Sequence, residues 1–593
     1  MSKKALQKLE LTWIGKGEEP KLEPRILIEN PEYSYGDSNS PNMLIHGDNL
    51  LALKALEQDY AGKVKCIYID PPYNTGNAFE YYDDNVEHSI WLNLISQRVK
   101  LLHSLLSNEG FMFLQIDDQE MAYASVLMDE VFGRNNRINI ITVNMSSLSG
   151  VKMTSAINGK RFPKSKEFIL LYAKNKGNGR LHIPKIPKGT WDKEYNMIIP
   201  EIQKDQFTTF SDLSEKEVNE ILKPLKILSL TAFAKDKGIK LTDEWKWNNA
   251  FRIFGTKSNV SLAKSLIGKS FEQDVVCYTN TEGNYRFFIS NYNKSAKDPR
   301  IELVQAEANS SVFLSDNWLD ISNDGGVGQE GNVHFPNGKK PEKLISRIIS
   351  AGTKPGDLVF DSFLGSGTTA AVAHKMGRRY IGVELGEHAK THCVPRLKQV
   401  VDGEQGGISK AVNWQGGGGF KFYTLAPSLL KQDKFGNWVI SQEYNADMLA
   451  AAMAKQEGFK YQPHESSYWK QGQSSEQDFI FTTTQFLTVE ALDSIKDEMQ
   501  PGETLLICCK SFQKECKSKY GNITIKKIPL ILLGRCEYGK EDYSLNIINM
   551  PLSEAEFPES EDEQDFIDDK ISVQELADKN KKQKKNEQLG LFD

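Results

Sequence analysis

The sequence has no apolar run long enough to cross a bilayer and too few cysteines for a disulfide framework. Seven cysteines are scattered over 593 residues, without the paired CxxC spacing of metal or redox motifs. We interpret them as reduced, mostly buried thiols. A zinc site is disfavoured because no histidine lies near the candidate ligands Cys508, Cys509, Cys516 and Cys536. No run approaches the ~18 apolar residues of a membrane span, and no signal-peptide stretch follows the first residues. We therefore expect a cytoplasmic protein with no membrane association.

The charge of the chain is unevenly distributed. The net charge is −6, but residues 145–300 hold 27 Lys and Arg against 16 Asp and Glu, a local +11 that leaves −17 for the remainder. The same segment carries seven aromatic residues that could stack on bases: Trp245, Trp247, Phe251, Phe254, Tyr285, Phe287 and Phe288. This composition suits phosphate neutralisation and base stacking, although a solvated basic surface has the same charge.

Strand and helix patterns alternate in two separate parts of the chain. The first part predicts strands at 43–48, 64–69 and 110–116 and helices at 49–58, 91–106 and 120–132. The second predicts helices at 343–351 and 368–375 and strands at 358–360 and 380–384. The stretch between them is irregular and rich in turn signals. We predict an α/β fold in which one parallel sheet is interrupted by an inserted domain.

At this length a single core is excluded, since cores stop growing at about 250–300 residues. We predict these domains: an N-terminal extension (1–40), the interrupted α/β domain (41–144 and 332–415), the inserted domain (145–331), a C-terminal α/β domain (420–552) and a disordered tail (553–593). The glycines at 416–419 mark a boundary because four glycines are costly inside a regular element.

The C-terminal region has its own alternating pattern. Strands and helices are expected in turn at 479–484, 488–498, 504–508, 511–520 and 523–528. Beyond them, residues 554–569 contain nine Asp and Glu in 16 positions and no Lys or Arg, a composition that predicts disorder.

The first loop with chemical potential is Asp70-Pro71-Pro72-Tyr73, which follows the apolar run at 64–69. The two prolines make it rigid. An exocyclic amine is a poor nucleophile because its lone pair is delocalised into the ring. The Asp70 carboxylate and the Pro71 carbonyl could hold its two N–H groups, and Tyr73 could provide a flat face for an extruded base. The alternative is a proline-terminated strand with a surface aromatic residue.

The second loop runs from Asp361 to Thr369. Gly365 and Gly367 permit close backbone approach, and a helix with unpaired N–H groups begins at their end. An ATP-binding P-loop requires lysine after its last glycine, where Thr368 stands. Glu384 ends the next strand, where a carboxylate can accept both hydroxyls of a ribose. S-adenosylmethionine or a dinucleotide fits this pattern, although the third glycine of the dinucleotide motif is missing.

Together these motifs resemble the β-class amino-DNA methyltransferases, in which the Asp-Pro-Pro-Tyr loop precedes the Phe-Leu-Gly-Ser-Gly loop and a target-recognition domain lies between them. More narrowly, the sequence resembles the modification subunits of type III restriction-modification systems. Five features carry this narrower resemblance: 47–50 (Gly-Asp-Asn-Leu), 70–76, 115–120, the Lys340-Pro341 pair and 416–420.

The resemblance implies a Rossmann-like S-adenosylmethionine-dependent methyltransferase that methylates N6 of a flipped adenine in duplex DNA. Its implied catalytic residues are Asp70, Pro71, Pro72 and Tyr73. The implied cofactor contacts are Asp48, Asp70, Asp361, Phe363, Gly365, Gly367, Thr368 and Glu384. No Pro-Cys pair of the cytosine-C5 class occurs. Cytosine-N4 methylation is the nearest alternative, but that class usually carries Ser where this chain has Asp70. A non-catalytic DNA-recognition subunit of a defence complex is the other alternative.

Several partners are expected. Duplex DNA would contact the inserted domain, and our candidate DNA-binding residues are Lys246, Arg252, Lys257 and Arg286. The resemblance implies an ATP-dependent restriction subunit, because this chain shows no lysine-bearing P-loop of its own. We hypothesise that residues 420–552 dock that partner or form a homodimer. The terminal Gln588-Leu589-Gly590-Leu591-Phe592 resembles the peptide by which bacterial proteins bind the DNA sliding clamp, and a short apolar anchor on a charged tail suits binding in a groove.

Overall fold

The computed structural model describes residues 10–72, 84–145, 162–204, 210, 213–321, 327–335 and 338–543. The chain divides into two compact units: unit 1 holds the residues up to 182 and from 316 onward, and unit 2 holds residues 183–315. No helix in the described ranges is both long and apolar enough to cross a membrane. The catalytic candidate Tyr73, the tail for which we expect disorder and the terminal peptide at 588–592 lie outside the described residues.

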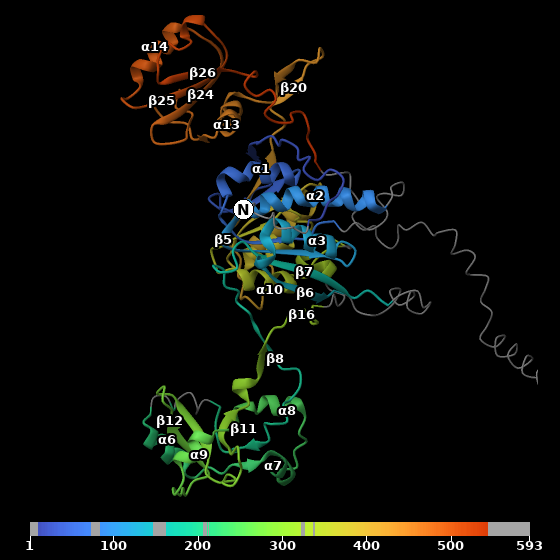
Figure 1. The fold of residues 1–593 in the computed structure, drawn as a ribbon, viewed down its shortest axis with the longest axis vertical. Helices are drawn as coiled ribbons and strands as arrows, with labels where there is room; N and C mark the ends of the chain where they lie inside the picture. The colour runs from blue at the N-terminus through green and yellow to red at the C-terminus, as the bar shows by residue number, and fades with distance from the viewer. Residues whose placement is uncertain are drawn as a thin grey trace, which may run out of the picture. The chain divides into compact units, whose positions relative to one another are not determined.

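The centre of unit 1 is an 11-stranded sheet in the order β1-β19-β3-β18-β17-β4-β5-β7-β6-β16, with β2 paired to β19 (Figure 1). Its strands are β1 (Leu27–Glu29), β2 (Tyr35–Gly36), β3 (Met43–His46), β4 (Val64–Ile69), β5 (Leu106–Ile116), β6 (Arg137–Asn144), β7 (Lys166–Ala173), β16 (Asn317–Trp318), β17 (Leu358–Asp361), β18 (Arg379–Glu384) and β19 (Gly419–Leu425). Strands β19, β3, β18, β17, β4 and β5 are mutually parallel, and β7 is antiparallel to both of its neighbours.

Helices cover both faces of this sheet. They are α1 (Asn49–Tyr60), α2 (Asp84–Leu105), α3 (Met121–Met128), α10 (Glu342–Gly352), α11 (Thr368–Lys375) and α12 (Val394–Val401). Alternate residues of β5 show the two faces. Met112 and Leu114 share a buried core with α1, α2 and α3, whereas Phe111 and Phe113 lie against Gly352 at the end of α10. The expected α/β fold is confirmed.

Between β17 and β4 the connections diverge. From β17 the chain passes through α11 to β18 on one side, and from β4 it passes through α2 to β5 on the other. This is a topological switch point, where parallel sheets leave a crevice at the carboxyl ends of their strands. The two loops singled out from the sequence follow these two strands.

The sheet extends beyond the domain boundaries expected from the sequence. In the N-terminal segment, which we had assigned to an extension, β1 and β2 pair with β19. Strand β19 follows the glycine run and pairs in parallel with β3, so the run does not end the domain. Strands β7 and β16 fall within the expected inserted domain but join the main sheet. Strand pairing between distant segments is not visible in local patterns, so these boundaries were misplaced.

Residues 426–543 of unit 1 form a smaller α/β region. Its elements are β20 (Leu430–Gln432), β21 (Trp438–Ile440), α13 (Ala446–Gln456), β22 (Lys460–Tyr461), β23 (Gly472–Gln473), β24 (Asp478–Leu487), α14 (Val489–Glu498), β25 (Thr504–Phe512) and β26 (Ile523–Lys527). A helix was expected at 511–520, but β25 continues to Phe512 and only a 3-10 turn follows at Lys514–Cys516. Six of the seven cysteines are buried free thiols, as expected, and Cys536 is half-buried.

The end of the region at 426–543 returns to the main body of unit 1. The Arg25 guanidinium, which is 2% exposed, donates to the Lys540 and Ala426 carbonyls and pairs with Glu541. The Tyr543 backbone N–H donates to Asp48 Oδ2 at 3.1 Å. The Tyr543 side chain packs with Leu50 and Leu51 of α1.

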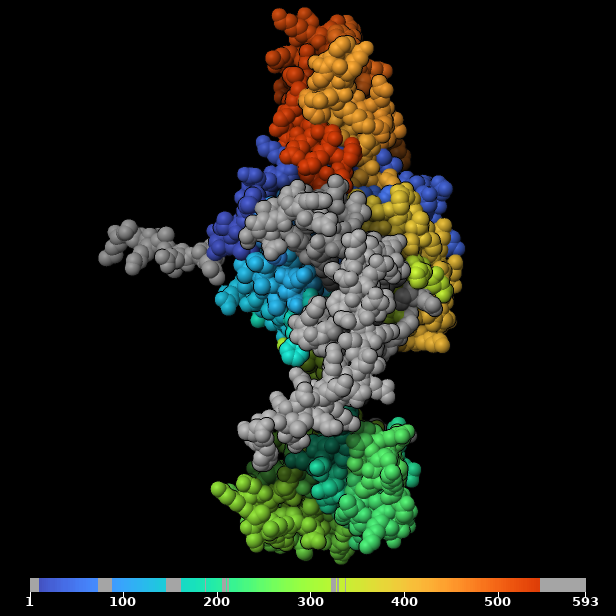
Figure 2. All heavy atoms as spheres, turned by 90° about the vertical axis from the view of Figure 1, so that its right-hand side faces the viewer, coloured from blue at the N-terminus to red at the C-terminus, as the bar shows by residue number. Residues whose placement is uncertain are grey.

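Unit 2, drawn in shades of green in Figures 1 and 2, is a separate α/β body. It contains a six-stranded sheet in the order β10-β9-β11-β14-β13-β12. Its elements are β8 (Lys185–Pro187), β9 (Met197–Ile198), α6 (Glu215–Leu222), β10 (Leu228–Ser229), α7 (Leu230–Asp236), α8 (Asp243–Asn248), β11 (Ile253–Ser258), α9 (Val260–Ser265), β12 (Val275–Thr279), β13 (Tyr285–Ile289), β14 (Arg300–Gln305) and β15 (Ser311–Phe313). Strands β8 and β15 form an antiparallel ribbon where the chain enters and leaves the unit.

Candidate active site at the carboxyl edge of the sheet

Acidic side chains gather at the carboxyl edge of four adjacent parallel strands. Asp70 follows β4, Asp361 ends β17, Glu384 ends β18 and Asp48 follows β3. Since these strands are neighbours in the order β3-β18-β17-β4, their ends meet on one side of the sheet. Asp70 and Asp361 flank the switch point, so the structure brings together the two loops that the sequence predicted to be functional.

The loop after β4 is held by its neighbours. Pro71 is buried, and the indole Nε1–H of Trp91 in α2 donates to the Pro72 carbonyl at 2.9 Å. The Asp70 carboxylate, 18% exposed, forms an ion pair with Lys340, whose Nζ lies 3.0 Å from Oδ2. Trp91 and Lys340 therefore fix the two ends of the described part of this loop.

The glycine loop turns sharply before α11. Gly365 and Gly367 have φ values of +57° and +80°, in the left-handed region that favours glycine. A Cβ built on Gly365 would meet no atom of the described residues within 4 Å, so they leave space open beside this part of the loop. Gly367 is the N-cap of α11. The loop therefore places a helix N-terminus at the carboxyl edge of the sheet, where backbone N–H groups can meet a polar ligand.

Asp361 holds the base of this loop. The Thr369 hydroxyl donates to Asp361 Oδ2 at 2.6 Å, and the Phe363 backbone N–H donates to Oδ1 at 2.9 Å. Burial raises the pKa of Asp361 to about 7, although both hydrogen bonds act in the opposite direction. The Phe363 side chain is partly buried against the sheet core. Asp361 therefore shapes the loop from within.

Glu384 is oriented toward the same loop. The Gly365 N–H donates to Oε2 at 2.7 Å, the Gly386 N–H donates to Oε1 at 3.1 Å, and His388 Nε2 lies 2.8 Å from Oε1. A carboxylate has about four acceptor positions, so these partners orient the group and leave acceptor capacity. The expected role of Glu384 as an acceptor for ribose hydroxyls stays a prediction.

Two further expected cofactor contacts, Asp48 and Thr368, are buried and hydrogen-bonded within the protein. Asp48 is 2% exposed and caps α1 by accepting from the Leu51 N–H, and Arg98 lies 3.4 Å from its other oxygen. Its neighbour Asn49 instead reaches the glycine loop, where its Nδ2 donates to the Ser362 carbonyl at 2.7 Å. The buried Thr368 hydroxyl accepts from Arg396 Nη1 at 2.7 Å. Asp48 and Thr368 thus support the site from behind.

A buried charge network underlies the glycine loop. The Glu342 carboxylate accepts from Lys375 Nζ at 2.8 Å and from Arg396 Nη2 at 2.9 Å, and all three side chains are 0% exposed. Arg396 Nη1 donates to the Ser366 carbonyl at 3.2 Å and also to the Thr368 hydroxyl. Burial raises the pKa of Glu342, but the two cations outweigh burial and lower it overall. The network joins α10, α11 and α12 beneath the loop.

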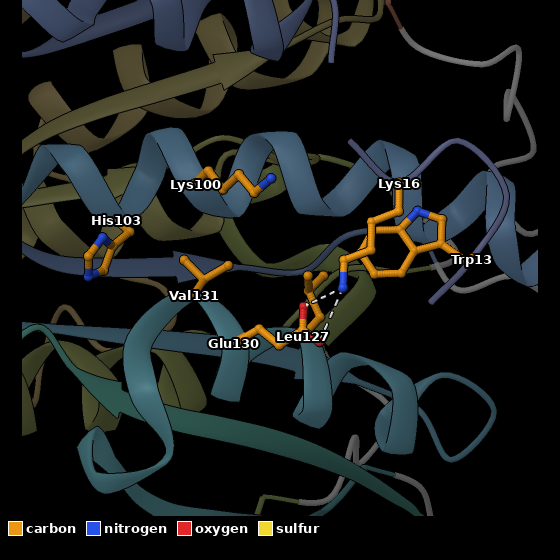
Figure 3. Close-up of a pocket in the computed structure, with 7 residues that line it drawn as sticks. All are labelled: Trp13, Lys16, Lys100, His103, Leu127, Glu130 and Val131. Atoms are coloured by element: carbon orange, nitrogen blue, oxygen red, sulfur yellow. Dashed lines mark hydrogen bonds and ion pairs between the residues drawn. The ribbon is translucent and has the colours of Figure 1, made fainter. Parts of the chain in front are cut away.

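A pocket of about 330 Å³ lies elsewhere in unit 1. It is lined by Trp13, Lys16, Lys100, His103, Leu127, Glu130 and Val131 (Figure 3). Its residues come from the N-terminal segment, the second half of α2 and the region of α3, and Lys16 pairs with Glu130 at 3.0 Å. Since the end of α2 leads to the amino end of β5, this pocket lies away from the carboxyl edge.

The four candidate DNA contacts differ in how far their charges are already paired. Arg252 donates to the Asn249 side chain and the Pro200 carbonyl, and Lys246 pairs with Asp243 at 2.8 Å. Lys257 is exposed and lies 3.2 Å from Glu302. Arg286 is exposed on β13, and it makes no ion pair with any described residue. Arg286 is therefore the one best placed for an external anion.

The aromatic residues of unit 2 form its core. Phe254 and Phe288 are each 2% exposed, and Trp245, Trp247, Phe251, Tyr285 and Phe287 pack against buried clusters. Phe254 and Phe288 are therefore core residues that no base can reach, and base stacking by the five partly buried rings stays a prediction. The positive charge expected for the inserted domain also lies mostly outside unit 2. Residues 183–315 hold 19 Lys and Arg against 17 Asp and Glu, whereas residues 145–182 hold eight against one.

Several residues that shape the site have no role that their local sequence indicates. Lys340 belonged to a family motif, but only the structure places it on Asp70. Arg396 had no signal because it acts on the glycine loop, which is distant in the chain, and His388, although it pairs with the nearby Glu384, belonged to no recognised motif. Trp91 had been assigned only to a helical pattern.

Comparison with known proteins agrees with this geometry. A family model described as DNA methylase matches residues 64–394, which is more than half of the chain and spans β4 to the start of α12. The chain belongs to the DNA methylase family. Within this family, the matched region includes both loops and the whole of unit 2.

Two relatives and one solved structure are similar to this DNA methylase. The "Probable type III restriction-modification enzyme HindVI Mod subunit" of Haemophilus influenzae is 39% identical over 410 residues, which is 65% of this chain and 54% of the relative. The type III restriction-modification enzyme EcoPI Mod subunit of Escherichia phage P1 is 28% identical over 61% of this chain and 60% of its own. The M1.HpyAVI–SAM complex has 14% identity and a TM-score of 0.28, covering 60% of this chain and 98% of that one. The chain thus spans little more than half the length of these two Mod subunits.

The buried carboxyl of Asp361 predicts a pH-dependent stability. Its pKa of about 7 lies above the unfolded value of about 3.9, so the folded state binds this proton more tightly. Its contribution to stability is therefore present below about pH 4 and is lost as pH rises toward 7. We expect Asp361→Asn to remove this slope, so that its stability relative to the wild type is higher at pH 8 than at pH 5.

Urea unfolding at the two pH values, without ligand, measures this difference. Each pKa unit corresponds to about 1.4 kcal/mol, so the change should be a few kcal/mol. Asp497→Asn is the control because that side chain is exposed on α14. A pH-independent effect of Asp361→Asn would contradict the prediction.

Proposed function

We propose that this DNA methylase transfers a methyl group from S-adenosylmethionine to N6 of a flipped-out adenine in duplex DNA. The observation that carries the proposal is the meeting of the Asp70 loop and the Asp361–Thr369 loop at one switch point of the sheet. One loop offers acceptors for an amine, and the other offers a glycine turn with a helix N-terminus. Membership of the DNA methylase family supports the same chemistry.

The residues around the glycine loop fit S-adenosylmethionine. Gly365 faces open space, Gly367 starts α11, and Glu384 stands oriented at the end of the next strand. Glu384 would accept the ribose hydroxyls, and the turn at Gly365 and Gly367 would let the cofactor approach the backbone closely. Asp361 and Phe363 would keep this turn in shape. The bound cofactor supplies an electrophilic methyl group on a sulfonium.

Asp70 would prepare the amine for attack. Its carboxylate and the Pro71 carbonyl accept the two N–H groups of adenine N6, which localises the lone pair on nitrogen. Tyr73, which lies outside the described residues, would stack on the extruded base. The methyl group would pass to N6 as its bond to sulfur breaks, the cofactor would leave as the neutral thioether, and one N6 proton would be lost to solvent. No covalent enzyme intermediate is required.

Adenine is favoured over cytosine N4 as the target because of Asp70, since the resembled N4 class usually carries Ser there. A non-catalytic recognition subunit is disfavoured because the sequences of both the Asp70–Tyr73 and the Asp361–Thr369 loops are complete. We further propose the role of modification and recognition subunit in a type III-like restriction-modification or phage-defence system. The likeness to two Mod subunits supports this role.

Asp70→Asn should lower methylation by at least about 100-fold, because an amide presents one acceptor instead of a charged pair. Binding of S-adenosylmethionine and duplex DNA should change little. Tritium transfer from labelled cofactor gives the rate, and single-molecule sequencing of DNA from expressing cells gives the modified base and its site. Asp497→Asn is again the matched control. Full activity of Asp70→Asn would show that the Asp70 loop is not the catalytic loop. Modified cytosine without modified adenine would select the cytosine-N4 alternative.

We propose an ATP-dependent restriction subunit as the partner, with residues 420–552 as the docking or homodimer region. Within this region, residues 426–543 have hydrophobic clusters of their own, separate from the core of the main sheet, which supports an additional role. Light scattering on the purified chain should show twice the mass of the 67.0 kDa protomer. Charge reversal of Lys510, which is exposed on β25, tests whether this face is used. A monomer that also fails to bind a co-expressed restriction subunit would refute both roles.

We also propose that the peptide at 588–592 binds the DNA sliding clamp. It lies outside the described residues, so the proposal rests on its sequence alone. A synthetic peptide carrying Gln588, Leu589, Leu591 and Phe592 should bind purified clamp with a Kd in the micromolar range. The same peptide with Leu591 and Phe592 replaced by alanine is the control, because these residues would fill the apolar pocket. Equal binding by both peptides, or none by either, would remove the proposal.

A further inference from the structure

A second buried charge cluster lies directly behind Asp70. Lys340 Nζ is 3.0 Å from Asp70 Oδ2 and 3.2 Å from Glu167 Oε2, and the Lys340 residue is only 8% exposed. The two carboxylates therefore share one ammonium. A cation at this distance favours the ionised form of a neighbouring carboxylate.

Three adjacent strands build the cluster. Asp70 follows β4, Gln115 lies near the end of β5, and Glu167 lies near the start of β7, which is antiparallel to β5 and so begins at the same edge. The Tyr68 hydroxyl donates to Gln115 Oε1 at 2.7 Å, and Gln115 Nε2 donates to Glu167. Tyr68 and Gln115 are buried and hydrogen-bonded, so Glu167 is held in one position.

Lys340 reaches the cluster from outside these strands. It lies just before α10, whose first residue Glu342 belongs to the charge network beneath the glycine loop. Burial lowers the pKa of Lys340, but the Asp70 and Glu167 carboxylates outweigh burial and raise it overall. The ammonium therefore stays charged over the range in which enzymes work.

We propose that Lys340 is a positioning residue for the methyl transfer: it holds the Asp70 carboxylate ionised and aimed at the substrate amine, and Glu167 and Gln115 fix the ammonium in place. The inference rests on the proposed function, because it assigns Asp70 the role of acceptor. A merely structural ion pair would stabilise the fold without changing the pH dependence of turnover. The two roles are therefore separable.

The test compares Lys340→Met and Lys340→Arg with Lys343→Met in the full-length chain. Lys343 is the matched control, since it lies three residues further along in the first turn of α10, is 57% exposed and pairs with Asp320 outside the site. Single-turnover methylation should fall about 100-fold in Lys340→Met, as expected when a reacting group loses its position, while the cofactor Kd stays within about threefold. Lys340→Arg keeps the positive charge and should recover most of the rate.

The pH profile gives the decisive signature. Without the ammonium, Asp70 ionises less readily, so the acid limb of the rate profile should move upward by about 1–3 pH units in Lys340→Met. The limb should move little in Lys340→Arg. An unchanged limb together with a rate loss equal in both variants would reduce Lys340 to a structural role and overturn the inference.

A readout independent of methylation keeps the two proposals distinguishable. Carbon-13 NMR of aspartate-labelled protein follows the Asp70 carboxyl directly, with Asp70→Asn identifying its signal. Its titration midpoint should be lower in the wild type than in Lys340→Met. If the wild type methylates no base but the Asp70 midpoint still differs between the wild type and Lys340→Met, the proposed function fails and the pairing of Lys340 with Asp70 stands. If the wild type methylates DNA and the midpoint does not shift, the inference about Lys340 fails alone.

Discussion

The contact between Glu342 and the two cations Lys375 and Arg396 is the constraint on which the site depends. All three side chains are completely buried, and Lys375 also pairs with Glu404, so replacing Glu342 would leave Arg396 without its carboxylate partner, at a cost of about 3–5 kcal/mol. Arg396 passes this constraint to the glycine loop through Ser366 and Thr368. A loop rich in glycine would otherwise have many conformations, and the buried charges select one of them.

The same short segment also serves the other loop. Lys340 and Glu342 are two residues apart at the start of α10, and they face the Asp70 side and the glycine-loop side respectively. The acceptor of the amine and the proposed cofactor turn are therefore placed relative to each other by one rigid helix start. Methyl transfer requires donor and acceptor in line at about 3 Å, so such a common support suits the reaction.

The sequence predicted the parts of the site that have local signals. The strand at 64–69 and the helix at 368–375 have the predicted limits, because an apolar run stopped by proline and a helix started after glycine are local features. Pairings between distant segments had no such signal. Strand β19 beside β3 and Lys340 beside Asp70 became visible only in the structure. Composition was the weakest guide for the inserted region. Its aromatic rings pack in or against the core of unit 2, and its excess of basic residues lies mainly before residue 183.

Residues 540–543 contact the main body of unit 1, and these contacts limit how the C-terminal region can be exchanged between related proteins. Arg25 is enclosed by Ala426, Lys540 and Glu541, and Asp48 receives the Tyr543 N–H next to the asparagine that supports the glycine loop. The region at 426–543 is thus fastened to the main sheet at both its ends. An exchange of this region between relatives, in evolution or in a chimera, is compatible with an intact cofactor loop only if Arg25 and Asp48 regain equivalent partners.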